Sequence, residues 1–339
     1  MAAYTTIDNP ELYFQVALYT GNFSTQSITL PGSEDMQPDM IWIKERDGTS
    51  SHALQDSVRG TGSKLMPNSS DAESTGETAY ITAFNSDGFS IGANNGINQD
   101  GILNVAWCWK ESATAGFDIN LHTGNGSART ISHSLSAKPD FFVVKGRTFA
   151  EQWECYHKSL GATKCLQWDD NSAEADLLNR FNDTEPTTSV FTVGDADAVN
   201  KNTYTYVTYL WRSVQGFSKM GKFTGTGNVD GPFVYTGFRP AFVMCKRTDS
   251  TGSWYMCDNK RLGYNGRPNY SATVGNVELT AHDSRNEAGG NTNVMDIFSN
   301  GFKLIQSGAE INASGGTFIY MAYAEQPFAN SNGVPATAR

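Results

Sequence analysis

The chain contains the stretch Pro139-Asp140-Phe141-Phe142-Val143-Val144-Lys145, and related stretches lie at equal distances on either side of it. Pro38-Asp39-Met40-Ile41-Trp42-Ile43-Lys44 begins 101 residues earlier, and Pro240-Ala241-Phe242-Val243-Met244-Cys245-Lys246 begins 101 residues later. A fixed period of this length is typical of tandem domains. The sequence therefore predicts one module present three times, which favours a repeated surface over a single catalytic cleft.

Two further motifs occur at corresponding positions in the three units. An aromatic-Thr-Gly turn precedes each stretch, at Tyr19-Thr20-Gly21, His122-Thr123-Gly124 and Phe223-Thr224-Gly225. An aromatic run closes each unit, at Val105-Ala106-Trp107-Cys108-Trp109-Lys110, Val207-Thr208-Tyr209-Leu210-Trp211-Arg212 and Tyr320-Met321-Ala322-Tyr323-Ala324-Glu325. We place the units at residues 12–113, 114–218 and 219–328, followed by a C-terminal tail at 329–339.

Strand patterns dominate each unit. The runs 141–145 and 242–246 are continuously apolar, as in strands buried on both faces. The β-branched and aromatic run 204–211 also favours a strand. Asp87-Gly88 and Asn300-Gly301 are typical of hairpin turns. One helix is predicted at 172–181, with Ser172 as its N-cap.

These patterns predict an all-β chain of three tandem β-sandwich repeats, jelly-roll-like or lectin-like, with minor helix. No Pro-rich or Gly/Ser-rich linker separates the units, so we expect them to pack closely.

Bulk composition narrows the classes of function. The formal net charge is −10 over 339 residues, and no block of lysine or arginine stands out, which argues against a nucleic-acid partner. No stretch approaches the length of a membrane span, and the N-terminal residues lack the pattern of a signal peptide. The five cysteines form no CxxC pair, so we expect neither a disulfide framework nor a zinc site, and we expect folding in a reducing cytosol.

Catalytic patterns are weak. The histidines form no HExxH motif, and we predict no metal, no cofactor and no catalytic residues. A glycosidase needs a facing pair of carboxylates. Asp39 and Asp140 occupy matched positions but Ala241 stands in the third unit, and His157 interrupts the matched pair Asp56 and Asp258. Loop and turn carboxylates are the simpler interpretation.

Two tryptophans at matched positions, Trp153 and Trp254, are open to two interpretations. They could be exposed platforms for sugar rings, or they could be core residues of the repeat. The loops that follow differ most between units, and such loops often determine binding specificity. We therefore name Trp153, Trp254, Arg261, Tyr264 and Tyr270 as candidate binding residues.

The motifs resemble a repeat found in virion proteins of marine tailed phages, including phages of cyanobacteria. The resemblance rests on 18–21, 37–44, 56–60, 86–89, 105–110, 231–243 and 312–322. It implies a tail-fibre-like or structural virion protein and brings no catalytic residues with it. Because the units fill the chain, with no anchoring domain or fibrous shaft, we expect a departure from an ordinary tail fibre.

Three hypotheses follow. The first is a non-enzymatic, tail-associated virion protein that attaches to other virion proteins and recognises host-surface polysaccharide. The second is a polysaccharide-degrading tail spike, and the third is a capsid decoration or head-fibre protein that stabilises the shell. In the first and third, the chain is made in the host cytoplasm and is present as a homo-oligomer or in many copies on the virion.

Overall fold

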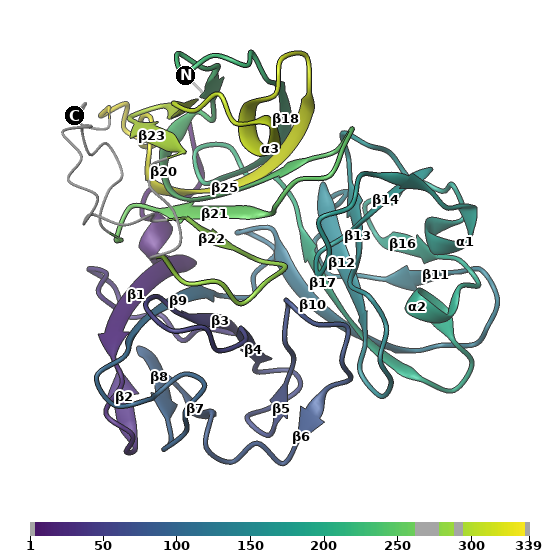
Figure 1. Cartoon of the computed structure of the whole chain (residues 1–339), viewed down its shortest axis with the longest axis horizontal. Coiled ribbons are helices and arrows are strands. Elements are labelled where there is room, and N and C mark those ends of the chain that lie inside the picture. The colour runs from purple at the N-terminus through teal and green to yellow at the C-terminus, as the bar shows by residue number, and fades with distance from the viewer. Residues whose placement is uncertain (1–3, 262–277, 288–293, 336–339) are drawn as a thin grey trace.

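Each of the three repeated Pro-to-Lys stretches forms an interior strand of a large antiparallel sheet in the computed structural model of the chain (Figure 1). These strands are β3 (Met40–Glu45), β12 (Phe141–Gly146) and β20 (Phe238–Arg247). The structure describes residues 4–261, 278–287 and 294–335.

The strands fall into three consecutive sets with corresponding topology. In each set the first strand pairs with the last, the last pairs with the Pro-to-Lys strand, and that strand pairs with the next strand along the chain. The large sheets have the orders β1-β9-β3-β4, β10-β17-β12-β13-β14-β15 and β18-β25-β20-β21-β22. Smaller sheets have the orders β2-β8-β7, β11-β16 and β19-β24-β23. We call β1 to β9 the first set, β10 to β17 the second set and β18 to β25 the third set.

The remaining bounds of the first set are β1 (Phe14–Thr20), β2 (Gln26–Ile28), β4 (Ala53–Asp56), β5 (Ser63–Lys64), β6 (Ser74–Thr75), β7 (Ile81–Asn85), β8 (Gly88–Ile91) and β9 (Leu103–Trp109), preceded by the short helix η1 (Pro10–Leu12). Those of the second set are β10 (Phe117–Thr123), β11 (Arg129–Ser132), β13 (Glu154–His157), β14 (Lys164–Gln167), β15 (Ala175–Asp176), α1 (Leu178–Phe181), β16 (Val190–Val193), α2 (Asp197–Asn200) and β17 (Thr205–Trp211). Those of the third set are β18 (Ser218–Thr224), β19 (Phe233–Tyr235), β21 (Tyr255–Asp258), β22 (Leu279–Thr280), β23 (Met295–Phe298), β24 (Gly301–Leu304), α3 (Ala309–Asn312) and β25 (Thr317–Pro327).

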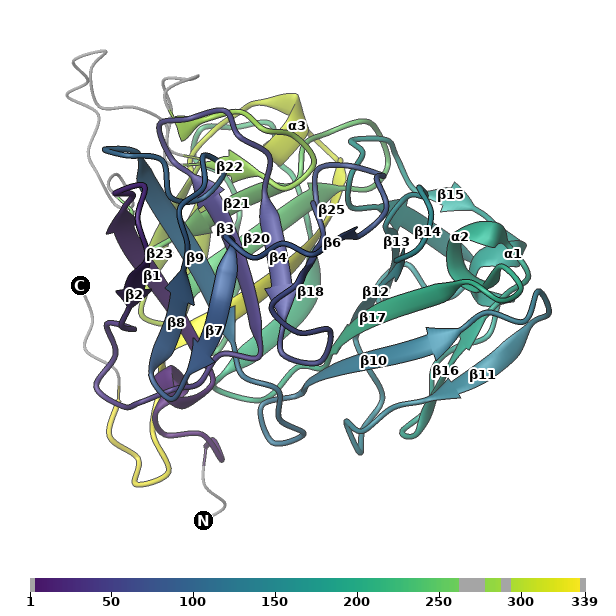
Figure 2. The same cartoon turned by 90° about the horizontal axis from the view of Figure 1, so that it is seen from below.

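The three sets share one central core. Figures 1 and 2 show the first and third sets side by side, with the second set standing beside them. All three large sheets contribute to one hydrophobic cluster, which contains all seven tryptophans of the chain. Each set also has a separate cluster formed by its large sheet and its small sheet together.

Alternation along the Pro-to-Lys strands explains why they are continuously apolar. In β12, Phe141 and Val143 lie in the central core, whereas Phe142 and Val144 lie in the cluster of the second set. Successive side chains of a strand point to opposite faces of the sheet, so a sheet that is covered on both faces needs apolar residues throughout. The structure confirms the predicted all-β sandwich class. The boundaries 12–113, 114–218 and 219–328 stay a prediction, and β18 begins at Ser218.

The predicted helix at 172–181 is wrong over most of its length. The helix α1 spans only Leu178–Phe181, and its N-cap is Leu177 rather than Ser172. Ala175–Asp176 instead forms β15, which pairs with β14, and the Glu174 N–H donates to the Thr248 carbonyl of the third set. Tertiary pairing with these neighbours overrides a local helical preference that was weak.

The glycine of each aromatic-Thr-Gly turn allows a close approach of two backbones. A Cβ on Gly21, Gly124 or Gly225 would stand 2.1, 2.1 and 2.2 Å from a backbone carbonyl oxygen of Gln99, Lys201 and Ala313, respectively. No larger residue fits there without moving the backbone, which explains the glycine at all three positions.

A buried asparagine closes the same region in each set. Asn98, Asn200 and Asn312 have no exposed surface. Each side-chain oxygen accepts from the backbone N–H that follows the turn glycine, and each amide group donates to two backbone carbonyls. The three copies therefore satisfy the same otherwise orphaned backbone groups.

The interface between the first and second sets contains a buried chain of charges. The Arg59 guanidinium lies 2.5 Å from the Asp56 carboxylate and 2.7 Å from Glu73. Glu73 also pairs with Arg147 of the second set at 2.8 Å. The Tyr209 hydroxyl of β17 donates to Asp56 at 2.7 Å and accepts from Arg59 at 3.0 Å.

The interface between the third and first sets repeats this arrangement. Arg261 lies 2.6 Å from Asp258 and 3.1 Å from Glu287, and Glu287 pairs with Arg46 of the first set at 3.0 Å. Trp107 takes the place of the tyrosine, and its indole N–H donates to Asp258 at 3.0 Å.

At the interface between the second and third sets, apolar and neutral residues replace the charges. His157 and Leu160 stand at the positions of the aspartate and arginine, and Met321 stands opposite. His157 and Met321 line a small cavity there. A backbone hydrogen bond common to the three interfaces is kept: the N–H groups of Glu73, Glu174 and Glu287 donate to the carbonyls of Arg147, Thr248 and Arg46 at 2.8, 2.8 and 2.7 Å.

Replacing the charged residues of one interface by the neutral residues found at the equivalent positions of another tests this description. Arg59→Leu leaves Asp56 buried without its cation, which should lower the free energy of unfolding by about 3–5 kcal/mol. Adding Asp56→His and Tyr209→Met gives these three positions the residues of the second–third interface, with Glu73 still paired to Arg147, and should recover at least half of that loss. Urea titration of the three proteins measures the differences.

The control is Lys164→Ala, which breaks the partly exposed ion pair with Asp176 and should change stability by no more than about 1 kcal/mol. An Arg59→Leu protein as stable as this control, or a triple variant no more stable than Arg59→Leu, would contradict the account.

Candidate functional site

The two candidate tryptophans are buried, so their interpretation as exposed platforms for sugars is wrong. Trp153 has 0% of its surface exposed and Trp254 has 2%. The Trp153 indole N–H donates to the Ser69 carbonyl of the first set at 3.0 Å, and the Trp254 N–H donates to the Gln167 carbonyl of the second set at 2.8 Å. The alternative interpretation, core packing, describes them: each fills an interface between two sets.

His52, at the matched position in the first set, makes an equivalent contact with the third set. Its Nδ1 accepts from the Trp42 indole N–H at 2.8 Å, so the proton of the neutral ring lies on Nε2, 2.9 Å from the Asp283 carbonyl. Burial, followed by the charge of Lys44, lowers the pKa of His52 to about 3. The ring is therefore neutral at physiological pH and acts as a linker between sets.

Arg261 is also buried, within the ion-pair chain between the third and first sets. Its prediction as an exposed binding residue is wrong, because its guanidinium is occupied by Asp258, Glu287 and the Met256 carbonyl. Tyr264 and Tyr270 lie outside the described residues.

The lysines that end the three repeated stretches are buried as well. Lys145 donates to the Ser70 carbonyl of the first set at 2.8 Å, and Lys246 donates to the Asn171 carbonyl of the second set at 3.3 Å. Lys44 donates to the Glu45 and Gly48 carbonyls. Burial lowers the pKa of each of these ammonium groups to about 8. Backbone carbonyls satisfy the ammonium donors, which makes these lysines structural.

A cluster of three carboxyl groups lies where the first set meets the second. The Glu111 backbone N–H donates to Asp39 at 2.8 Å, and the Glu111 carboxylate accepts from the Ile119 N–H at 3.1 Å. Burial, followed by the neighbouring Asp118 and Asp39, raises the pKa of Glu111 to about 7 against the effect of the Ile119 N–H. Neither the cavity beside His157 nor the cleft described next is lined by these groups.

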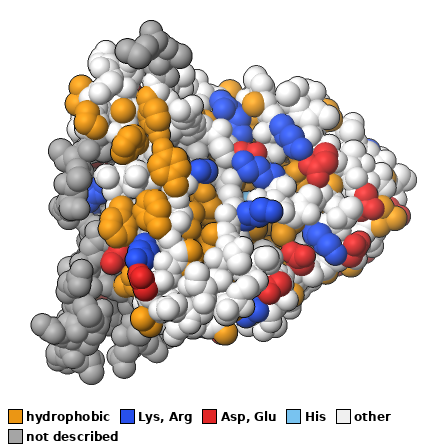
Figure 3. Space-filling view, turned by 90° about the horizontal axis from the view of Figure 1, so that it is seen from above, with side chains coloured by type: hydrophobic (Ala, Val, Ile, Leu, Met, Phe, Trp, Pro, Cys, Tyr) orange, Lys and Arg blue, Asp and Glu red, His pale blue; other side chains and the backbone are white. Residues whose placement is uncertain are grey.

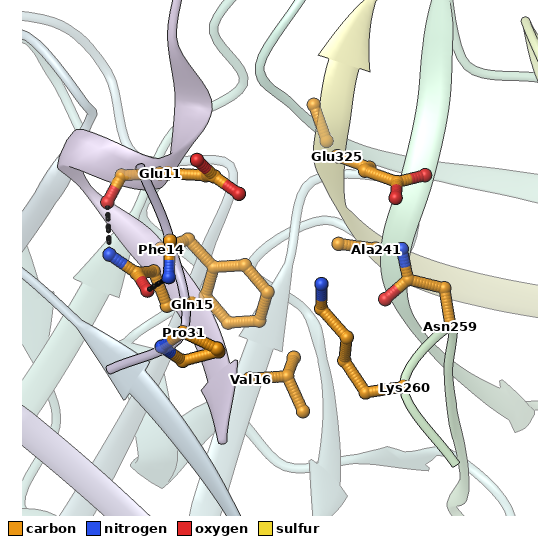
Figure 4. A pocket seen from close by; sticks show the side chains of 11 residues that line it. Glu11, Phe14, Gln15, Val16, Pro31, Ala241, Asn259, Lys260 and Glu325 are labelled. Carbon is orange, nitrogen blue, oxygen red and sulfur yellow. Dashed lines mark hydrogen bonds between the residues drawn. The ribbon is translucent and has the colours of Figure 1, made fainter. Parts of the chain in front are cut away.

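A small cleft with a mixed apolar and polar lining lies between the first and third sets. Figure 4 shows the Lys260 ammonium reaching up beside Phe14, with the carboxylates of Glu11 and Glu325 above it. Asn259 lines the same cleft, and its side-chain oxygen is buried without a hydrogen-bond partner. The cleft offers acceptors and one ammonium group to water or a small polar molecule.

An exposed row of aromatic side chains lies on the outer face of the third set, and we call it the aromatic surface. Phe233 and Tyr235 flank the buried Val234 on β19, and they are 47% and 50% exposed. Phe298 of β23 is 39% exposed and meets Phe233 edge to face, with ring centroids 5.9 Å apart. The row ends with Tyr4 and Phe328, which also meet edge to face. Figure 3 shows hydrophobic side chains gathered on the side of the molecule that carries this set.

The aromatic surface was not predicted, although the sequence contains a signal for it. The buried pairs Ile28–Phe89, Ile131–Phe191 and Val234–Phe302 are equivalent in register. In the first set, Ser27 and Thr29 flank Ile28. In the second set, Thr130 and Ser132 flank Ile131. Only a residue-by-residue alignment of the units shows that Phe233 and Tyr235 replace exposed hydroxyl residues.

Three further findings concern residues 4–261, 278–287 and 294–335. No cluster of three or more His, Cys, Asp or Glu side chains is arranged to hold a metal ion there. No helix in the same ranges has the length and apolar character to cross a bilayer. All five cysteines are buried free thiols, and burial raises the pKa of each.

The raised pKa of Glu111 predicts a specific pH dependence. The folded state holds this proton up to about pH 7, whereas the unfolded chain releases it near the ordinary value of 4.5. The contribution of Glu111 to stability is therefore complete below pH 4.5 and is lost as the pH rises through 7. Glu111→Gln keeps an acceptor for the Ile119 N–H and cannot ionise, so its melting temperature should fall less between pH 5 and pH 8 than that of the parent chain. Parallel pH profiles for both proteins would refute this.

Comparison with known proteins adds a family without a known function. No curated protein matches the chain. A family model described as a domain of unknown function, DUF7483, matches residues 9–327, which include all three sets of strands. The chain therefore belongs to the DUF7483 family.

Proposed function

We propose that the chain is a non-enzymatic structural protein of a bacteriophage virion, associated with the tail, that serves attachment and host-surface glycan recognition. The observation that carries this proposal is the shared central core, to which all three large sheets contribute. All three sets pack on this core with one face of the large sheet, and the small sheet of each set packs on the opposite face. A rigid body with several outward faces suits a particle protein that contacts virion partners on one face and a host surface on another.

The interfaces between the sets support the same role. Buried ion pairs, tryptophan N–H donors and lysine–carbonyl bonds cross them. Such contacts hold neighbouring units in one relative orientation, because breaking any of them leaves a buried polar group without a partner. A fixed orientation favours simultaneous contact with several surface groups, which raises avidity.

Capsid decoration is a second candidate, favoured by the corresponding topology of the three sets around one core. A chain with three similar faces suits a three-fold position on a shell, where closed symmetry repeats one contact. In this alternative the small sheets contact neighbouring shell proteins and no host glycan is bound.

Cryo-electron microscopy of particles from a host that expresses an epitope-tagged chain tests these roles. The proposal predicts tagged density on the tail, with the third set facing outward, and slower adsorption by particles that lack the chain. Density arrayed over the capsid, with normal adsorption and reduced heat resistance of stripped particles, would favour decoration. Purified particles without any tagged density would contradict both roles.

A further inference from the structure

We propose that the aromatic surface formed by Phe233, Tyr235, Phe298, Tyr4 and Phe328 is a binding site for an oligosaccharide. This inference deepens the proposed function, because it assigns the host-glycan contact to one set and to residues that the sequence analysis did not name.

The aromatic surface is continuous and built from fixed rings. Phe233 and Phe298 meet edge to face, the Tyr4 and Tyr235 hydroxyl oxygens lie 3.4 Å apart, and the Tyr4 hydroxyl also donates to the Gly237 carbonyl at 2.6 Å. Edge-to-face contacts hold one ring against another while leaving ring faces free. A ligand therefore meets a surface that is already ordered and loses little affinity to the ordering of side chains.

A glycine in the central strand lies beside the Phe233 ring. Gly301 pairs with Tyr235 on one side and with Phe298 on the other. A Cβ on Gly301 would stand 2.2 Å from the Val234 carbonyl oxygen, as one on Gly88 would stand 2.0 Å from the Ile28 carbonyl oxygen, so the backbone approach requires the glycine in both sets. The same Cβ would stand 2.8 Å from Cζ of Phe233, so the Phe233 ring lies against the glycine. The Phe233 ring therefore occupies space that a side chain at position 301 would otherwise fill.

The identity of the residues argues against packing as the reason for them. The equivalent exposed positions hold serine and threonine in the first and second sets, and those sets form the same small-sheet pairing. The fold therefore does not require aromatic residues at these positions. Aromatic side chains that the scaffold does not need, half-exposed in water, indicate a ligand.

The size of the surface favours a sugar over a protein. At about 200 Å² for each aromatic side chain, the exposed fractions of Phe233, Tyr235, Phe298 and Phe328 amount to roughly 350 Å². A stable protein interface buries about 800 Å² on each partner. The exposed area of these four aromatic residues is less than half of that, and it suits a short oligosaccharide, whose C–H faces pack on aromatic rings.

Polar groups along the edge complete the site. Lys219 lies over the Tyr235 ring, 5.3 Å from its centroid, and donates to the Tyr235 carbonyl. Lys303, the cross-strand neighbour of Phe233, pairs with the exposed carboxylate of Asp230. Donors and acceptors beside an apolar platform can hydrogen-bond sugar hydroxyls and fix the orientation of the ligand.

The test uses the intact chain and a variant whose new residues are those of the second set at the same positions. Phe233→Thr/Tyr235→Ser should fold, because Thr130 and Ser132 occupy the equivalent places. The probe is an array of short oligosaccharides built from neutral hexoses, N-acetylhexosamines or uronic acids. We expect the parent chain to bind at least one class, and the variant to bind that class at least about tenfold more weakly, a difference of about 1.4 kcal/mol. The control is Leu178→Ser, which removes an exposed apolar side chain from the second set and should bind as the parent does.

Three results would overturn the inference: no class binds the parent chain, the variant binds as tightly as the parent, or both variants lose binding equally. Sedimentation equilibrium adds a further discriminating outcome. If the parent chain is a dimer and the Phe233→Thr/Tyr235→Ser variant is a monomer, the aromatic surface is an interface between copies of the chain. If tagged density is found on tails together with any of these results, the virion role stands and only the glycan site is removed. If the parent chain binds a glycan but no tagged density is found on particles, the glycan site stands and the virion role is removed.

Discussion

The structure depends on burial of the second face of each large sheet. One face of each sheet packs on its own small sheet, and the opposite face packs in the central core with all seven tryptophans. If the sets were apart, that face would expose a large apolar area, and burying apolar surface contributes roughly 25 cal/mol per Å². Trp107, Trp153 and Trp254 also place their indole N–H groups against acceptors in a neighbouring set, so the burial is specific in direction as well as favourable. The three sets are therefore parts of one folded body rather than beads on a chain.

Around that core, the interfaces show how one geometry tolerates different chemistry. Two of the described interfaces contain a buried ion pair, Asp56–Arg59 in one and Asp258–Arg261 in the other. The equivalent positions of another interface hold the neutral residues His157 and Leu160. A buried ion pair gains little net stability over a well-packed apolar substitute, but it strongly disfavours any arrangement that leaves one partner alone. The neutral interface between the second and third sets therefore differs in kind from the two charged interfaces, although the backbone pairing is the same.

Much of the fold was predictable from the sequence, because the signals that determine it are local. Continuous apolar runs such as 141–145 predicted strands buried on both faces, and Asp87-Gly88 and Asn300-Gly301 predicted the hairpins β7–β8 and β23–β24. The helix at 172–181 was wrong because β14 and Thr248, which override its local preference, are distant in sequence. The buried asparagines could have been found from the repeated pairs Ile97-Asn98, Val199-Asn200 and Ile311-Asn312.

The candidate site was much less predictable. The sequence favoured core packing for Trp153 and Trp254 but left exposed platforms open, and only the position of a neighbouring set decides between the two interpretations. Arg261 was assigned to a variable loop, yet its partners Asp258 and Glu287 hold it inside an interface. The aromatic surface was not predicted, because Phe233 and Tyr235 lie within 231–243, a stretch that was interpreted only as part of the family resemblance. Differences between units carry more information about function than the features that the units share.

Native-state hydrogen exchange of the intact chain, measured along β3, β12 and β20, tests the central claim of one folded body most directly. If the shared core unites the sets, the slowest amides of the three strands will exchange with the same free energy of opening, and that value will equal the global free energy of unfolding. Clearly separated opening energies, with one strand exchanging through an independent unfolding of its own set, would contradict the account.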